Sequence, residues 1–369
     1  MGAFGVRRTG PEFTGVRLRV PSRCLHPGHR DRALLRQPDR TFDRGRGGER
    51  DAGEGSGETP AFGSRPLAEP AHRRFGRRVT EVRAVASAKV NLYLRILGRR
   101  PDGHHDLQTL FQAVDLHDVL DVRREGSGIQ LVVEGDDVGP VEENLVVRAA
   151  RAYLAAADLR GEGLHMRLEK RIPVGAGLGG GSSDAAATFL ALDRLFPGAV
   201  TLRRITELAS GIGSDVPFFL GVSPLALGRG RGEIIEAREP FPSLAGVVVL
   251  PPVQVSTREA YRELARAREG SRISTPPVLV VPTDWDQMAA GAANDFEVVV
   301  CRTHPPVADA IAALRATAPL VALVSGSGSA SFALYHTVGG AEKAAAVLSQ
   351  RAEFRVFTVR TLTAWPNRT

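Results

Sequence analysis

Five glycines lie within residues 175–181, and a helix-like, alanine-rich segment follows them directly. Glycine lets backbone N–H groups approach a ligand closely, and the first N–H groups of a helix have no partner inside that helix. Ser182 and Ser183 occupy the predicted N-cap positions, with Asp184 in the first turn. Together these features predict an anion site, most naturally for a phosphate chain, at a helix N-terminus.

The elements around this loop follow from the residues before it. Leu164 to Leu168 alternate like a strand or the edge of a helix, so the loop is expected between an extended segment and a helix. No lysine follows Gly181, which excludes the spacing Gly-x-x-x-x-Gly-Lys-Ser/Thr of a Walker loop. A flexible turn capped by serines is the alternative interpretation.

A second candidate set lies in a strand-like segment, residues 83–97. Lys89 and Asn91 are two residues apart, which places both on one face of a strand. The chain has three lysines among 48 basic residues, so Lys89 stands out. A compact ammonium suits contact with a phosphate or a carboxylate, although a surface lysine is the simpler alternative. Residues 99–103 predict a turn, and a second strand follows it.

Asp215 lies between Gly213-Ser214 and an apolar run, residues 216–220. An aspartate in such a turn commonly caps the backbone. The apolar flank would desolvate the carboxylate unless a cation lies nearby, which makes Asp215 a candidate catalytic group.

Charge is distributed unevenly along the chain of 369 residues. Residues 1–78 carry 17 Arg and 9 acidic residues, whereas the whole chain has a net charge of +7, which leaves residues 79–369 near −1. This argues against a basic nucleic-acid surface on the folded part. The first 78 residues are expected to be disordered, without a folded role; an Arg-rich RNA-binding arm, a transit peptide and an untranslated segment are alternatives.

Cys24 and Cys301 are far apart and form no metal or redox spacing, which predicts inert thiols in a reducing cytoplasm. No segment is apolar for long enough to span a membrane, and no signal peptide is evident. A proline-flanked break at residues 239–243 predicts a domain boundary. The expected organisation is an extension (1–78), a first domain (79–240) and a second domain (241–369).

The sequence resembles the GHMP kinases (galactokinase, homoserine kinase, mevalonate kinase and relatives). The resemblance rests on Pro173-x-x-x-Gly-Leu-Gly with the following Gly-Ser-Ser, and on the small-residue loop Ser325-Gly-Ser-Gly-Ser329. Residues 170–184, 87–94 and 98–112 are similar to the branch that phosphorylates 4-diphosphocytidyl-2-C-methyl-D-erythritol. The resemblance implies an α+β fold of two domains, a ribosomal-protein-S5-like N-terminal domain and a ferredoxin-like C-terminal domain.

The resemblance also implies roles for individual residues. The segment Gly213-x-Asp-Val-Pro-Phe-Phe219 matches the motif that carries the catalytic base, which implies that role for Asp215, with Lys89 beside it. ATP would be held by residues flanking and forming the glycine loop: Asn144, Lys170, Pro173, Val174, Gly175, Ala176, Gly177, Leu178, Gly179, Gly180, Gly181, Ser182 and Ser183. For Asn144, a plain helix N-cap is an equal alternative.

Substrate contacts are implied for Asn91, His104, His105 and Tyr261. His105 matches the family histidine that binds cytosine, whereas His104 replaces a tyrosine that stacks on the base. Core packing is the alternative for Tyr261.

The implied activity is ATP- and Mg²⁺-dependent phosphorylation of the substrate 2-hydroxyl, in the non-mevalonate isoprenoid pathway, by a cytoplasmic enzyme without membrane or nucleic-acid partners. The sequence leaves the Mg²⁺ ligands and the oligomeric state unassigned. A GHMP kinase for another small alcohol and an RNA-binding protein remain as alternatives.

Overall fold

The computed structural model describes residues 79–269 and 282–366, all within one compact unit. The predicted N-terminal extension and Cys24 lie outside the described residues.

A long antiparallel hairpin, β1 (Glu81–Arg99) and β2 (His105–Arg124), forms the centre of the first sheet. The hairpin turns at the predicted residues 99–103, where Asp102 accepts a hydrogen bond from the backbone N–H of His104. The sheet order is β3-β4-β2-β1-β8, with β5 paired to both β2 and β6. The further strands are β3 (Ile129–Glu134), β4 (Leu164–Glu169), β5 (Leu225–Gly230), β6 (Ile234–Ala237) and β8 (Ala293–Asn294).

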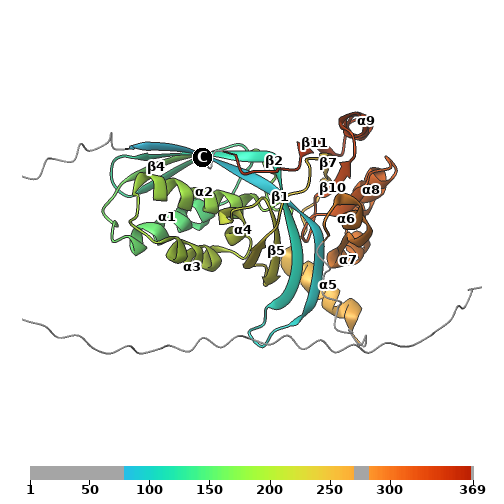
Figure 1. Ribbon diagram of the computed structural model, residues 1–369, viewed down its shortest axis with the longest axis horizontal. Helices are drawn as coiled ribbons and strands as arrows, with labels where there is room; N and C mark the ends of the chain where they lie inside the picture. The colour runs from blue at the N-terminus through green and yellow to red at the C-terminus, as the bar shows by residue number, and fades with distance from the viewer. Residues whose placement is uncertain (1–78, 270–281, 367–369) are drawn as a thin grey trace, which may run out of the picture. The chain divides into compact units, whose positions relative to one another are not determined.

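Four helices lie on one face of this sheet (Figure 1). They are α1 (Leu145–Ala156), α2 (Gly180–Leu195), α3 (Leu202–Ile212) and α4 (Val216–Leu220), preceded by a short 3-10 helix, η1 (Val141–Glu143). Their apolar sides form a common core with the sheet, in which Tyr153, Phe189 and Phe218 are fully buried. Helix α2 therefore lies against the centre of the sheet with the glycine loop at its N-terminus.

The second sheet has the order β11-β7-β10-β9. Its strands are β7 (Ala245–Leu250), β9 (Val321–Val324), β10 (Ser331–Tyr335) and β11 (Arg355–Arg360). Helices α8 (Pro305–Arg315) and α9 (Val338–Leu348) pack on it through Ile311, Leu314 and Leu348. Helices α5 (Thr257–Arg268), α6 (Trp285–Gly291) and α7 (Asp295–Thr303) complete this half of the unit.

The two sheets are joined at several points. Strand β8 pairs in parallel with β1 at Tyr93 and Leu94, and Thr361 forms an isolated bridge with Val114 of β2. The architecture has two sheets with helices and agrees with the predicted α+β class. The domain boundary predicted at residue 240 remains a prediction. Strand β8, which comes after residue 240 in the sequence, pairs within the first sheet.

Two local predictions were wrong. Helix α2 begins at Gly180, with Gly179 as the N-cap at a left-handed φ of 73°, so Ser182 and Ser183 lie inside its first turn. The sequence of residues 202–209 also predicts an amphipathic helix with Leu202, Ile205 and Leu208 facing the core. Leu202 is instead 70% exposed because it is the first residue of α3, while Ile205 is buried. Helix α2 begins earlier than predicted because glycine can adopt a left-handed φ at the N-cap, and Leu202 is exposed because it lies at a helix end.

Candidate active site

The glycine loop, residues 173–179, connects β4 to α2 and lines a cavity of about 340 Å³. Gly177 has a φ of +79°, and a Cβ atom there would lie 2.2 Å from the carbonyl oxygen of Ser325. Only glycine fits this close approach of two backbones. The cavity is also lined by Val138, Glu143, Asn144, Leu145, Lys170, the three residues 180–182 and Asp184.

The small-residue loop between β9 and β10 packs behind the glycine loop. The hydroxyl of Ser325 donates to the carbonyl oxygen of Gly177 at 3.0 Å, and the N–H of Ala330 donates to that of Ala176 at 3.1 Å. Asn294 holds this second loop in turn, because its side-chain amide donates to the carbonyl oxygens of Val324 and Gly326. The second loop therefore fixes the backbone of the first.

Lys89 and Asp215 meet beside the glycine loop. The ammonium Nζ of Lys89 lies 3.5 Å from the carboxylate Oδ2 of Asp215, and the backbone N–H of Lys89 donates to the carbonyl oxygen of Leu178. The Lys89 side chain is buried, whereas that of Asp215 is 28% exposed. Asp215 is the N-cap of α4 but makes no capping hydrogen bond, so its carboxylate is available to other groups. The pair places a carboxylate beside an ammonium at a partly open surface.

Asn91 belongs to the same polar group on β1. Its side-chain oxygen Oδ1 accepts a hydrogen bond from Lys89 Nζ at 2.7 Å, and its side-chain Nδ2 donates to the hydroxyl of Thr109 at 2.8 Å. That hydroxyl donates to the carbonyl oxygen of Tyr93. This chain of hydrogen bonds fixes the position of the Lys89 ammonium.

Lys170 lies in a different environment. Its buried ammonium pairs with Asp184 of α2 at 2.8 Å and with Asp118 of β2. Burial raises the pKa of Asp184 above its usual range, although Lys170 acts in the opposite direction. Lys170 thus lines the glycine-loop cavity with its charge already occupied by two carboxylates.

A separate cavity of about 730 Å³ contains His104, His105 and Tyr261. The rings of His105 and Tyr261 are stacked, with centroids 4.5 Å apart and an interplanar angle of 17°. Burial, with a smaller contribution from the charge of Asp215, raises the pKa of Tyr261 to about 12. Burial and the nearby charges of Arg99, Arg268 and His104 lower the pKa of His105, which favours its neutral form. Gly213 and Ser214, which directly precede Asp215, also line this cavity.

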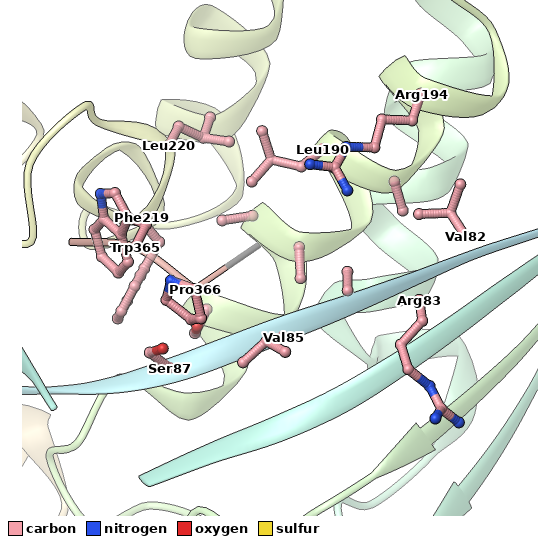
Figure 2. A pocket seen from close by; sticks show the side chains of 15 residues that line it. Val82, Arg83, Val85, Ser87, Leu190, Arg194, Phe219, Leu220, Trp365 and Pro366 are labelled. Carbon is pink, nitrogen blue, oxygen red and sulfur yellow. The ribbon is translucent and has the colours of Figure 1, made fainter. Parts of the chain in front are cut away.

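Asn144 caps α1, since its side-chain oxygen accepts from the N–H of Val146 at 2.9 Å, and it also lines the glycine-loop cavity. Both interpretations of this residue are compatible with its place. Ser183 does not line that cavity. It lines another cavity, of about 240 Å³. Figure 2 shows residues of β1 and α2 that line this cavity, among them Val85 and Leu190. Trp365 and Phe219 lie at one end of this cavity of about 240 Å³.

Sequence reasoning missed Asp118 and gave Asp184 only a place in a helix turn. Asp118 is fully buried in β2, and Asp184 is nearly so. The signal was the alternation along β2: Asp118 falls in phase with the buried Leu120 and Val122, and a buried charge requires a partner. Lys170 is the partner of both carboxylates.

In the part of the chain that the structure describes, no group of three or more His, Cys, Asp or Glu side chains could hold a metal ion. Among those residues, no helix has the length and apolar character needed to cross a bilayer. Burial raises the pKa of Cys301 to about 11, so its thiol stays protonated, as expected for an inert cysteine.

Comparisons with known proteins identify the class. The family described as GHMP kinases N terminal domain matches residues 144–221, and GHMP kinases C terminal matches residues 281–353. A homoserine kinase from Cytophaga hutchinsonii shares the fold at 19% identity, with a TM-score of 0.59 over 79% of this chain and 97% of that one. The fold and the glycine loop are those of a GHMP kinase.

More similar proteins define the branch. The 4-diphosphocytidyl-2-C-methyl-D-erythritol kinase of Pelotomaculum thermopropionicum is 40% identical over 76% of this chain and 98% of its own length. That of Solibacter usitatus is 40% identical over 74% of this chain and 87% of its own length. A crystal structure of 4-(cytidine 5'-diphospho)-2C-methyl-D-erythritol kinase matches with 38% identity and a TM-score of 0.64, covering 76% of this chain and 99% of that one. The chain belongs to the 4-diphosphocytidyl-2-C-methyl-D-erythritol kinase family.

Proposed function

We propose that this enzyme transfers the terminal phosphoryl group of ATP to the 2-hydroxyl of 4-diphosphocytidyl-2-C-methyl-D-erythritol, a step of the non-mevalonate route to isoprenoid precursors. The observation that carries the proposal is the position of the Lys89–Asp215 pair. Its lysine is hydrogen-bonded through the backbone to the glycine loop, and Gly213 and Ser214, which directly precede its aspartate, line the other cavity. A base between a phosphate site and an acceptor site is the arrangement that phosphoryl transfer requires.

Asp215 is the proposed general base. Its carboxylate accepts the proton of the attacking hydroxyl, while the Lys89 ammonium, 3.5 Å from that carboxylate, offsets charge that develops at the reacting oxygen. The buried Asn91 holds the lysine in place and faces the same side of β1.

The glycine loop is the proposed phosphate site. The backbone N–H groups of residues 177–182 and the N-terminus of α2 offer donors and a positive partial charge to the ATP phosphates. The N–H of Ser183 donates instead to the carbonyl oxygen of Gly179 within the helix. The cavity beside the loop, with Asn144 and Lys170 in its wall, is the proposed place of the nucleoside. Mg²⁺ would arrive bound to the phosphate oxygens, whose charge it neutralises.

The cavity around His104, His105 and Tyr261 is the proposed cytidine site. With the His105 and Tyr261 rings only 4.5 Å apart, no base fits between them. The cytosine therefore stacks on an outer ring face, or His105 turns aside. A neutral His105 can both donate and accept a hydrogen bond, which suits an amide-like base edge.

ADP release tests the proposal most simply. The full chain is mixed with ATP, Mg²⁺ and the diphosphocytidyl substrate, and mevalonate and homoserine serve as alternative alcohols. We expect rapid turnover with the cytidine compound alone, and inhibition by cytidine diphosphate that competes with that substrate. Turnover of another alcohol without inhibition by cytidine nucleotides would instead assign a different GHMP kinase activity.

We also propose a cytoplasmic location and a division into domains at residues 79–240 and 241–369, preceded by a dispensable extension. Removal of residues 1–78 is expected to leave kcat and both KM values unchanged. An RNA-binding role of the extension would instead appear as salt-sensitive RNA affinity that is lost on its removal.

A further inference from the structure

Asp118 of β2 contacts the short segment that leads from β4 into the glycine loop. It is fully buried in β2, and its Oδ1 accepts hydrogen bonds from two successive backbone N–H groups, of Arg171 at 2.5 Å and of Ile172 at 2.8 Å. These two residues connect β4 to the loop. Its other oxygen, Oδ2, pairs with the Lys170 ammonium. One carboxylate thus binds three successive residues.

Lys170 extends this contact to the other end of the loop. Its Nζ donates to Oδ2 of Asp184, which lies in α2 one turn after the loop ends. The same Nζ is close to the backbone of Gly180, since a Cβ atom there would lie 3.2 Å away. Asp118, Lys170 and Asp184 therefore connect the β2 strand, the residues before the loop and the first turns of the helix after it.

Stability alone does not account for this cluster. Placing two carboxylates and one ammonium in the interior costs desolvation energy, and a well-packed apolar cluster of equal volume usually stabilises a fold as well or better. The cluster also carries more negative than positive charge beside a cavity suited to anions. Charged hydrogen bonds are directional, however, and fix backbone positions more closely than apolar contacts do.

We propose that Asp118 is a positioning residue of the nucleotide site, which sets the conformation of the glycine loop through the two backbone N–H groups and, by way of Lys170, through α2. The inference rests on the proposed function in one respect, that ATP binds at this loop. Asp118 touches neither the nucleotide cavity nor the Lys89–Asp215 pair. Its removal therefore acts on ATP and leaves the acceptor site as it was.

Two substitutions distinguish the hydrogen bonds to the backbone from the ion pair with Lys170. Asp118→Asn keeps an oxygen that can accept from the backbone N–H groups but loses the ion pair with Lys170. Asp118→Ala loses both. The matched control is Asp121→Asn, three residues further along β2, where Asp121 pairs with the exposed Arg83 at 2.7 Å.

The experiment is calorimetric titration of the full chain with Mg²⁺ and a non-hydrolysable ATP analogue, together with steady-state kinetics. We expect Asp118→Asn to weaken nucleotide binding about tenfold, the scale of one charged hydrogen bond, and Asp118→Ala to weaken it further. The KM for ATP should rise in parallel, while the KM for the cytidine substrate and the behaviour of Asp121→Asn remain those of the wild type.

Circular dichroism identifies any variant that fails to fold, and Asp118→Asn then decides the question without Asp118→Ala. Wild-type nucleotide affinity in a folded Asp118→Asn would overturn the inference. Equal rises in both KM values would also overturn it, because they indicate general loosening of the fold. If the wild-type chain itself binds no nucleotide, the proposed function fails first, and this inference fails with it.

Discussion

At the scale of single residues, the site is a set of buried charges with defined partners. Lys89 has Asp215 and Asn91, and Lys170 has Asp118 and Asp184. The resemblance pointed to Lys89, Asn91 and Asp215, and the structure brings them together. It gave no role to Asp118, because partners far apart in sequence meet only after β2, β4 and α2 have packed.

Asp184 gives a prediction about pH. Because burial raises its pKa in the folded state, the folded protein binds more protons than the unfolded chain at pH values above about 4, the usual pKa of an aspartate. Asp184 therefore lowers the stability as the pH rises toward its folded pKa. The charged groups that act on it are Lys170 and Asp118.

In Asp184→Asn this titration is absent. We expect the difference in melting temperature, variant minus wild type, to increase as the pH rises from about 4 toward neutral. Thermal unfolding without nucleotide measures it. A difference that is constant or decreases with pH would contradict the assignment of a raised pKa to Asp184.

At the scale of elements, the glycine loop depends on the loop between β9 and β10. The glycine run allowed the first loop to be predicted, since no other residue type permits such close backbone contact. The resemblance also singled out the second loop, residues 325–329, and the structure places it behind the first. The helix start at Gly180 was not predictable from caps alone, because Gly179 terminates the loop by its own φ of 73°.

Two glycines of the loop test this dependence. Gly175→Ala and Gly177→Ala both place a side chain at positive φ, but only the second Cβ would meet another backbone, at 2.2 Å from the Ser325 oxygen; around Gly175 nothing lies within 4 Å. We expect the Gly175 variant to cost about 1 kcal/mol of unfolding free energy and the Gly177 variant about 3 kcal/mol or more.

Urea unfolding measures both variants, and nucleotide titration shows whether the loop still binds. The Gly177 variant should lose most of its ATP affinity, because its loop must move away from Ser325. Similar losses in the two variants would show that backbone strain, rather than contact between the two loops, limits substitution.

At the scale of the whole unit, the end of the described chain returns to the first sheet. The Leu362 carbonyl accepts from the side chain of Gln112, and Trp365 packs edge-on against Phe218 of α4 with ring centroids 5.5 Å apart. The resemblance allowed the α+β class to be predicted. This return was not, because one tryptophan and a proline near the C-terminus have no periodic pattern.

Trp365 is therefore expected to support α4, the helix that begins directly after Asp215. Trp365→Ala should lower the unfolding free energy by about 1–3 kcal/mol, through lost aromatic contact and buried area. Thr363→Ala, an exposed neighbour, is the control. Chemical denaturation of both variants measures the effect, and equal stability of the tryptophan variant and the control would contradict a supporting role.

The central claim is that Asp215 accepts the proton of the acceptor hydroxyl, and one measurement tests it most directly. Single-turnover ADP formation is followed in the full chain, in Asp215→Asn and in Asp286→Asn, a control at an exposed position of α6. The account predicts a rate about a hundredfold to ten-thousandfold lower in Asp215→Asn, with ATP affinity near that of the wild type. A wild-type rate in Asp215→Asn would contradict it.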